Sequence, residues 1–293
     1  MKILVTGSES FVGQELIKQC LDQNISVIGL DIVKKSNSNY SFHSYDIRDE
    51  NIHEIIPEKL DALIHLAAFS NPYECKGKPI LSFDINVMGT LNLIKNALKK
   101  NTQQFIFASS EWVYGDFHPD EEKDENSSIH IEDLTSEYAL SKLVSESNLR
   151  QQFLQGFCDT TILRFGIIYG PRENNWGAVE SIAHTVKTQN EVIIGSKKNG
   201  RRFIHVSDIA SGIIKSLGLK GFNIINLSGN EMIILDKLIT TCEKLYSKKV
   251  KTIEKDPLKI NIRNPSNSKA KKLLNWEPQI KLAEGLQSLN NFL

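Results

Sequence analysis

Short runs of apolar residues alternate with longer amphipathic stretches along the first half of the chain. Each run has the length of a strand and is apolar throughout, and the stretches between them repeat apolar residues at helical spacing. Strands that are apolar on both faces are typical of a parallel sheet covered by helices on both sides. The predicted strands are 2–6, 25–31, 61–67, 104–110 and 160–166, and the predicted helices are 11–23, 79–100 and 136–153. This pattern predicts an α/β fold with a doubly wound, Rossmann-type parallel sheet.

The alternation becomes less regular after Gly170 and Pro171. Strand-like runs still occur at 192–195 and 203–206, and helical stretches at 179–188, 208–219, 235–247, 269–274 and 282–292. The polar stretch 116–133 lies between a predicted strand and a predicted helix of one sheet, which predicts a surface loop. We predict two domains. The first covers 1–166 with a returning segment at about 203–227, and the second is a smaller, mostly C-terminal lobe of 167–202 and 228–293.

The composition is that of an ordinary globular protein, with 40 % apolar and 24 % charged residues. Lys plus Arg equals Asp plus Glu at 35 each, so no net charge favours nucleic acid or an anionic membrane as a partner. No apolar run approaches the roughly 20 residues of a membrane span, and the N-terminus lacks the pattern of a signal peptide. The 4 cysteines lie far apart and form no CxxC pair, which disfavours a metal site and favours the reduced thiols of a cytoplasmic protein.

The sequence TGSESFVG at 6–13 is the first candidate site, because it joins a predicted strand to a predicted helix. Gly7 permits a tight turn there, and Gly13 lets the helix pack closely on the sheet. The helix N-terminus presents backbone N–H groups and a positive dipole end to the pyrophosphate of a dinucleotide. Ser10 stands where such a turn usually has its middle glycine. Its small side chain is compatible with binding, and its hydroxyl can donate to a phosphate oxygen.

Asp31 ends the second predicted strand, where a carboxylate accepts hydrogen bonds from the adenosine ribose of a dinucleotide. A carboxylate at this place repels the 2′-phosphate of NADP, so the sequence favours NAD. Lys34 and Lys35 follow closely and leave NADP open. The alternative is that the glycines are ordinary turn residues and that Asp31 is an acid in a loop.

Tyr138 and Lys142 form a Y-x-x-x-K pattern on a predicted helix and therefore share one face, one turn apart. An ammonium near a phenol favours the phenolate, so we expect Lys142 to lower the pKa of Tyr138 from about 10. Tyr138 is thus a candidate general acid or base for a carbinol. Ser110 ends a central strand, at the edge where open α/β sheets bind ligands, and can hydrogen-bond the same carbinol oxygen. The alternative is a chance YxxxK on a helix surface.

The motifs along the chain resemble those of the extended short-chain dehydrogenase/reductase family, and within it the NAD-dependent nucleotide-sugar epimerases and dehydratases. The resemblance spans nearly the whole chain. The motifs are TGxxxxxG (6–13), Asp31, HLAA (65–68), NVMGT (86–90), SSEWVYG (109–115), YALSK (138–142), YGPR (169–172), RRFIHVSD (201–208) and SKAKKLLNWEP (268–278).

This resemblance implies that the first domain binds NAD and that the C-terminal lobe binds a nucleoside-diphosphate sugar. Ser110, Tyr138 and Lys142 match the catalytic triad of the family. Residues expected on the substrate side are Asn86, which matches an asparagine that supports the active site, Glu111, Trp112, and Arg201, which matches the arginine of an RDF-type motif. Residues expected to contact NAD are Gly7, Ser10, Phe11, Val12, Gly13, Asp31, Asp46, Ile47, Leu66, Ala67, Ala68 and Lys142.

The chain departs from the family pattern at three places. Ser10 replaces the middle glycine, and Ile167 stands where many members have the asparagine of an N-V-Y-G-P motif. Arg263 is an ambiguous match to the arginine that usually precedes the tail motif. These departures concern recognition of the substrate more than binding of NAD.

The residue pattern after Ser110 discriminates between reactions. Trp112 stands where sugar 4,6-dehydratases have a glutamate that serves the elimination of water, and Glu111 on an extended segment would point the other way. Dehydration is therefore disfavoured. An epimerase needs no additional acid, because the 4-keto sugar rotates and accepts the hydride on its other face.

Two further alternatives remain. A 4-keto reductase also fits the motifs, although such enzymes often use NADPH, which Asp31 disfavours. An NAD(P)-sensing binding protein without turnover is the non-enzyme alternative, and the intact Ser110, Tyr138 and Lys142 favour an enzyme over it.

The predicted helix 79–100 has apolar residues on almost every side, whereas a helix covering one face of a sheet needs a single apolar stripe. We therefore predict a homodimer in which helices 79–100 and 136–153 of two subunits pack together. The alternative is that the second domain of the same chain covers the additional apolar residues.

Overall fold

The computed structural model describes residues 1–33, 39–174 and 176–293. Its contacts divide the chain into two compact units. The first is Met1–Gly115, Ser128–Arg164 and Ala210–Ile225, and the second is Asp116–Ser127, Phe165–Ile209 and Asn226–Leu293. The predicted domain boundaries stay a prediction, and the two units differ from them at 116–127, 165–166, 203–209 and 226–227.

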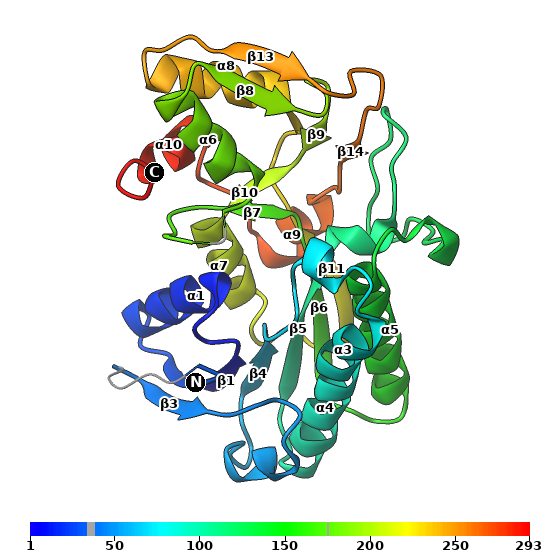
Figure 1. The fold of residues 1–293 in the computed structure, drawn as a ribbon. Coiled ribbons are helices and arrows are strands. Elements are labelled where there is room, and N and C mark those ends of the chain that lie inside the picture. Colours follow the sequence, from blue (N-terminus) through cyan, green and yellow to red (C-terminus); the bar gives the residue numbers. More distant parts are fainter. Residues whose placement is uncertain (34–38, 175) are drawn as a thin grey trace. The chain divides into compact units, whose positions relative to one another are not determined.

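A seven-stranded sheet forms the centre of the first unit (Figure 1). Neighbouring strands pair in parallel, from β3 through β2, β1 and β4 to β5, which confirms the predicted parallel Rossmann-type sheet. In spatial order the strands are β11 (Phe222–Leu227), β6 (Asp159–Phe165), β5 (Gln104–Ser110), β4 (Ala62–His65), β1 (Lys2–Thr6), β2 (Ser26–Asp31) and β3 (Ser41–Ser44). This is the doubly wound strand order, in which the carboxyl ends of β1, β4 and β5 meet at the edge where ligands bind.

Helices cover both faces of this sheet, with α4 and α5 on one side and α1 on the other (Figure 1). Short helical turns lie in the connections between them. The helices are α1 (Phe11–Asp22), α2 (Pro72–Cys75), α3 (Pro79–Phe83), α4 (Gly89–Lys99), α5 (Glu137–Leu154) and α7 (Val206–Lys215), and the turns are η1 (Glu50–Glu54), η3 (Glu111–Tyr114) and η4 (Ile131–Asp133). The predicted single helix 79–100 is wrong in one respect, because the π-helical turn η2 (Asp84–Met88) separates α3 from α4.

The described residues of the second unit form a three-stranded sheet, two pairs of short strands, and helices around a separate apolar core. Its strands are β7 (Ile167–Tyr169), β8 (Glu191–Ile194), β9 (Gly200–Arg201), β10 (Phe203–His205), β12 (Ile233–Ile234), β13 (Lys251–Glu254) and β14 (Ile262–Arg263). Its helices are α6 (Ala178–Thr188), α8 (Leu235–Leu245), α9 (Ser268–Leu274) and α10 (Leu282–Ser288). Side chains from α6, α8 and α10 pack together in this core, among them Ala183, Leu238 and Leu286.

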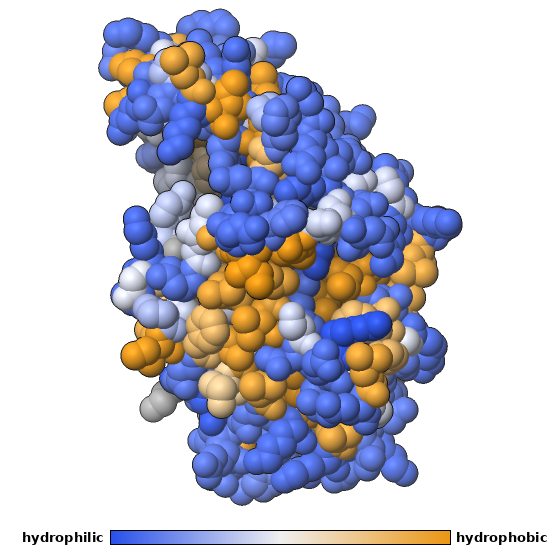
Figure 2. All heavy atoms as spheres, turned by 90° about the vertical axis from the view of Figure 1, so that its right-hand side faces the viewer, coloured by the Kyte–Doolittle hydropathy of each residue, from blue (hydrophilic) through white to orange (hydrophobic). Residues whose placement is uncertain are grey.

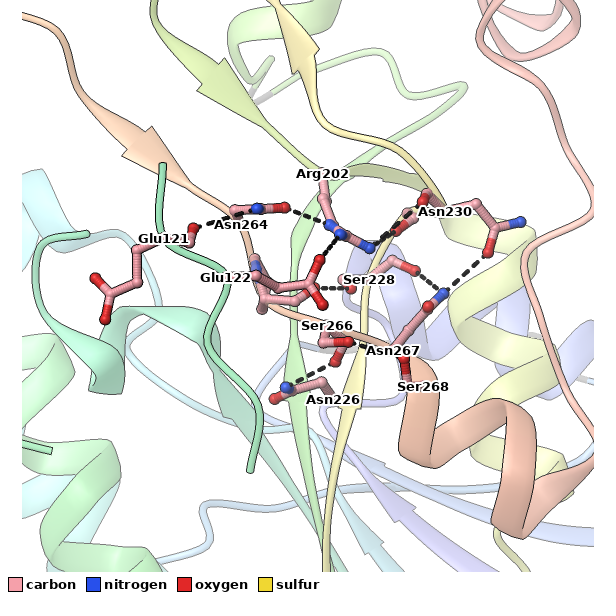
Figure 3. A network of polar contacts seen from close by, with 12 residues as sticks. Glu121, Glu122, Arg202, Asn226, Ser228, Asn230, Asn264, Ser266, Asn267 and Ser268 are labelled. Carbon is pink, nitrogen blue, oxygen red and sulfur yellow. Dashed lines mark hydrogen bonds and ion pairs between the residues drawn. The ribbon is translucent and has the colours of Figure 1, made fainter. Parts of the chain in front are cut away.

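A network of polar side chains fastens the segment 116–127 within the second unit (Figure 3). Arg202 forms an ion pair with Glu122 and donates from Nε to Oδ1 of Asn264 at 2.6 Å. Asn264 in turn donates to the backbone carbonyl of Glu121 at 3.2 Å. The backbone N–H of Asn226 donates to Glu125 at 2.6 Å. The predicted surface loop is therefore held by specific bonds in its middle, at Glu121, Glu122 and Glu125.

None of the described helices is long and apolar enough to cross a membrane.

Candidate active site

The turn between β1 and α1 has glycine at two points where the backbone passes other backbone closely. Gly7 has φ +69°, and a Cβ there would lie 2.7 Å from the backbone nitrogen of Ala67. A Cβ on Gly13 would lie 2.2 Å from the carbonyl oxygen of Gly7. Since real Cβ atoms are not found this close to other atoms, both positions require glycine. Gly7 thus has the positive φ of the predicted tight turn, whereas the close approach at Gly13 is to the backbone of the turn itself and not to the sheet.

Ser10 is the N-cap of α1 and has an ordinary extended conformation, with φ −67° and ψ 165°. Its Oγ accepts a hydrogen bond from the backbone N–H of Gly13 at 3.1 Å. An L-residue adopts this conformation without strain, so the turn does not need glycine here. The serine satisfies one of the N–H groups at the start of the helix, and its hydroxyl proton can still be donated to another group.

The first turn of α1 is suited to a pyrophosphate. It contains no acidic residue and begins with the backbone N–H groups of Phe11 and Val12. The positive end of the helix dipole adds to these donors. The close-packed glycines and the capped helix start therefore fit the diphosphate of NAD.

Asp31 lies at the end of β2, directly beside this turn. Its Oδ2 accepts from the backbone N–H of Glu9 at 2.9 Å, and its Oδ1 accepts from that of Val33 at 3.3 Å. Each carboxylate oxygen has more than one lone pair, so both can also accept from ribose hydroxyls. Lys34 and Lys35, which left NADP open, lie outside the described residues.

Asp46 and Ile47, both predicted to contact NAD, form contacts with other residues of the protein. Arg48 forms ion pairs with Asp46 and with Asp84, both at 2.6 Å, and its hydrogen bonds lower the pKa of Asp46. The Ile47 side chain is buried in the core below α4, and its carbonyl accepts from Asn92 at 2.9 Å. The buried side chain argues against the predicted contact of Ile47 with NAD through that side chain.

His65, at the end of β4, connects β1 to the helical segment that follows α3. Its Nε2 and Nδ1 lie 2.9 Å from the Thr90 hydroxyl and 2.8 Å from the Thr6 hydroxyl. The Thr90 hydroxyl itself donates to the carbonyl of Asn86 at 2.6 Å, so it accepts from His65. This arrangement assigns the proton of neutral His65 to Nε2 and makes Thr6 a donor to Nδ1. Burial and the charge of Lys142 hold the pKa of His65 well below 6.5.

Asn86 is buried, and its side-chain amide forms hydrogen bonds to neighbouring protein groups. It accepts from the backbone N–H of Phe69 at 2.8 Å and donates to the Phe69 carbonyl at 3.0 Å. It also donates to the Ser141 hydroxyl at 2.9 Å, and Ser141 donates to the carbonyl of Tyr138 at 2.8 Å. Asn86 therefore supports the start of α5, and its burial argues against the predicted direct contact with substrate.

Ser110, Tyr138 and Lys142 come together where β5 ends beside the first turns of α5. A hydrogen bond joins Ser110 to Tyr138, and the Ser110 Oγ also accepts from the backbone N–H of Trp112 at 3.3 Å. Lys142 Nζ donates to the carbonyl of Ala108 at 2.7 Å and lies 5.9 Å from the centroid of the Tyr138 ring. The three side chains predicted from separate motifs thus form one buried cluster.

The predicted lowering of the Tyr138 pKa by Lys142 is wrong for this structure. Burial raises the pKa of Tyr138 to about 12, although its bond to Ser110 acts in the opposite direction. Burial also lowers the pKa of Lys142 to about 7, against the charge of Glu146. The reason is that the same desolvation that opposes the phenolate also disfavours the ammonium that was expected to stabilise it.

Glu111 and Trp112 differ in exposure. Glu111 is fully buried, whereas Trp112 is half-buried. They lie on the 3₁₀ turn η3, so the predicted extended segment is wrong. The burial of Glu111 argues against its predicted contact with substrate.

Arg201 belongs to the second unit, on β9. Its guanidinium donates to the carbonyls of Gly200 and Asn261, each at 2.7 Å, and to the side chain of Asn261. Arg202 stands where an RDF-type motif has its aspartate, and it takes part in the network of Figure 3. Recognition of the sugar nucleotide by Arg201 stays a prediction.

Sequence reasoning missed the buried residues behind the cluster. Ser109 donates to Glu146 at 2.5 Å, and Glu146 forms an ion pair with Arg164 at 2.6 Å. Glu146 lies one helical turn beyond Lys142, so extending the Tyr138–Lys142 row along the helix would have found it. No local pattern points to Arg164, which comes from β6.

The sequence model of the NAD dependent epimerase/dehydratase family matches residues 3–227. The chain belongs to this family. The predicted family, its Rossmann-type fold and its cofactor NAD are thereby confirmed.

Curated relatives of similar length catalyse different reactions. UDP-glucuronate 4-epimerase of Thermodesulfobacterium geofontis is 28 % identical, over 99 % of this chain and 95 % of that protein. UDP-glucuronic acid decarboxylase 3 of Arabidopsis thaliana is 29 % identical, over 98 % of this chain and 87 % of that protein. The family member described here is therefore an NAD-dependent enzyme of nucleotide sugars, and identity at this level does not select the reaction.

The fold is also that of a solved epimerase. The crystal structure of UDP-glucose 4-epimerase with UDP-glucose from Thermotoga maritima has a TM-score of 0.88 and 24 % identity, and the match covers 100 % of this chain and 98 % of that one. This agreement concerns the fold alone.

Proposed function

We propose that this protein is an NAD-dependent nucleotide-sugar epimerase that works through a transient 4-keto sugar. The observation that supports this choice most directly is the pairing of a complete Ser110–Tyr138–Lys142 cluster with the absence of an acid at position 112. A dehydratase needs a glutamate there, and the neighbouring Glu111 is fully buried. Hydride removal and return need no such acid.

In the proposed reaction, NAD held at the turn between β1 and α1 would supply the acceptor for a hydride from the sugar carbon and the donor for its return. As the phenolate, Tyr138 would accept the proton of the sugar hydroxyl at its phenol oxygen and later give it back; because burial raises its pKa to about 12, the positively charged nicotinamide of bound NAD would have to favour that form. Ser110 donates a hydrogen bond to the same sugar oxygen. Lys142 lies one turn beyond Tyr138 and binds the nicotinamide ribose. The burial of all three side chains excludes water and strengthens the electrostatic interactions among them.

The cofactor contacts follow from the same arrangement. We propose that Gly7, Ser10, Phe11, Val12 and Gly13 surround the pyrophosphate and that Asp31 binds the adenosine ribose. Asp46 and the backbone of 66–68 complete the predicted cofactor contacts.

A panel of UDP- and dTDP-sugars tests the proposed reaction, with the products separated by chromatography and identified by NMR. An epimerase interconverts two diastereomers without net consumption of NAD. Loss of carbon dioxide, formation of a 4-keto-6-deoxy sugar, or stoichiometric consumption of NADPH would each assign a different reaction and overturn the proposal. NAD bound to the protein without any turnover would favour the sensing alternative. Tyr138→Phe is the control for activity from contaminating enzymes.

We also propose that the enzyme is a homodimer. Large apolar side chains are exposed on the helices expected at the interface, including Ile80 (86 % exposed) and Met88 (57 %). A groove of about 340 Å³ runs along α5, lined by Ile131, Leu143 and Val144 among others. Figure 2 shows apolar side chains gathered on this side of the first unit. Exposed apolar surface of this kind is typical of an interface.

A further inference from the structure

An acidic residue lies within the phosphate-binding turn itself. Glu9 is half-buried, and its backbone N–H donates to Asp31 Oδ2 at 2.9 Å. The hydroxyl of Tyr40, just before β3, donates to Oε1 of Glu9. Three segments far apart in the sequence thus join at the end of β2, where Asp31 is placed to bind the ribose.

The Tyr40 ring is held in place by packing as well as by this hydrogen bond. A Cβ on Gly29 would lie 2.4 Å from Cε2 of Tyr40, so the ring covers β2 at a position where only glycine leaves room. Burial and the charges of Glu9 and Asp31 raise the pKa of the Tyr40 phenol, which is therefore a firm donor at neutral pH. Both carboxylates thus lie near one phenol.

We propose that Glu9, oriented by Tyr40, is a second acidic residue that selects NAD against NADP. A ribose hydroxyl donates to a carboxylate, whereas a 2′-phosphate brings about −1.5 to −2 charges toward it. Asp31 suffices to bind the hydroxyls, and Glu9 adds a second negative charge beside the same position. The role concerns the cofactor alone and holds for any nucleotide sugar that the enzyme accepts.

Calorimetric titration with NAD⁺ and NADP⁺ tests this role without any measurement of turnover. In Glu9→Gln we expect the affinity for NADP⁺ to rise about five- to tenfold, the scale of one charge pair a few ångströms apart near a surface, and the affinity for NAD⁺ to stay within about twofold. Glu9→Ala should give the same direction. Tyr40→Phe retains the charge of Glu9 but removes the hydrogen bond that orients the Glu9 side chain, so it should raise the affinity for NADP⁺ less than Glu9→Gln does. Asp22→Asn, at the other end of α1, removes one charge as a control and should leave the ratio unchanged.

Salt provides an independent check. If the discrimination is electrostatic, the difference between the native protein and Glu9→Gln should shrink between about 50 mM and about 500 mM salt. An equal loss of affinity for both cofactors in Glu9→Gln would show that Glu9 only maintains the turn. An unchanged ratio of the two affinities would show that its charge does not act on the 2′ position. Either result overturns the proposal.

Discussion

Glu146 and Arg164 form a buried ion pair next to the cluster of Ser110, Tyr138 and Lys142. Arg164 donates from Nη2 to Oε2 at 2.6 Å and from Nε to Oε1 at 3.0 Å, and both side chains are almost fully buried. The Arg164 guanidinium also lies 4.7 Å from the ring centroid of Tyr114. Because Glu146 follows Lys142 by one turn of α5, its carboxylate favours the ammonium form of that lysine.

Glu146→Gln should therefore both destabilise the protein and change the charge of Lys142. Removal of one partner leaves Arg164 as an uncompensated buried charge, which costs about 3–5 kcal/mol in free energy of unfolding. Denaturant unfolding measures this loss, with the exposed Glu132→Gln as the control. The loss of the carboxylate should also lower the pKa of Lys142 further, which a shift in the pH profile of turnover would report. A variant as stable as the native protein would show that the pair contributes nothing.

Ser10→Gly should leave the affinity for NAD unchanged or raise it by no more than about 1–2 kcal/mol, the scale of one hydrogen bond or modest strain. The conformation of Ser10 does not require glycine, and its role as N-cap is satisfied nearly as well by glycine. Ser10→Ala removes the cap and should cost about 1 kcal/mol of stability. Calorimetry with NAD and thermal unfolding measure the two effects. If the native protein failed to bind NAD and Ser10→Gly restored binding, Ser10 would mark a remnant of a cofactor site.

The native protein should be a dimer at micromolar concentration, as measured by light scattering. Leu143→Glu places a charge in the groove along α5 and should produce a monomer, because an unpaired charge is not tolerated in a buried interface. Leu258→Glu is the matched control, since Leu258 is 95 % exposed in the second unit. A monomeric native protein would remove the proposed interface and favour coverage of these residues within one chain.

The sequence predicts the central strands because they are apolar on both faces, as the buried residues of β1 and β5 illustrate. It misses β3, which lies at the edge of the sheet. The four residues of this strand, SFHS, include a single apolar side chain among polar ones, so no apolar run marks the strand. It also misses the π-helical turn η2. There the carbonyl of Asn86 accepts from the hydroxyls of Thr90 and Ser145, at 2.6 Å and 3.0 Å, and such competing donors disturb the regular helix.

The residues of the candidate site likewise include some that the sequence predicts and some that it misses. Tyr138 and Lys142 are found from local spacing, because a helix places residues four apart on one face. Arg164 and Tyr40 cannot be found in this way. Arg164 lies on β6 and Tyr40 just before β3, each in a different element from its partner, so only the folded chain brings the partners together. The predicted direction of the Tyr138 pKa shift is wrong because spacing along a helix contains no information on burial, and burial decides the direction of the shift here.

Stability should fall as the pH drops below about 6.5, in part because of His65. In the unfolded chain a histidine takes up a proton near that pH, whereas the folded protein holds the pKa of His65 well below it. The unfolded state then binds more protons, so acid favours unfolding. Urea unfolding at a series of pH values measures the slope. It should be shallower in His65→Gln and unchanged in His118→Gln, where the histidine is exposed. An equal slope in His65→Gln would show that His65 is charged in the folded protein.

Tyr138→Phe should bind NAD normally and lose most of its turnover. The substitution retains the ring that packs beside Lys142 and deletes the hydroxyl bonded to Ser110, so turnover should fall by about 10²–10⁴, the usual worth of general acid–base catalysis. Lys142→Met should impair both NAD binding and turnover, since one side chain serves both. Ser110→Ala should reduce turnover less, because a water molecule can replace its hydroxyl in part. Each variant is measured for turnover of a sugar nucleotide that the native enzyme accepts and for its NAD content. Near-native turnover in Tyr138→Phe would exclude Tyr138 as the proton acceptor and leave the YxxxK pair with a structural role only.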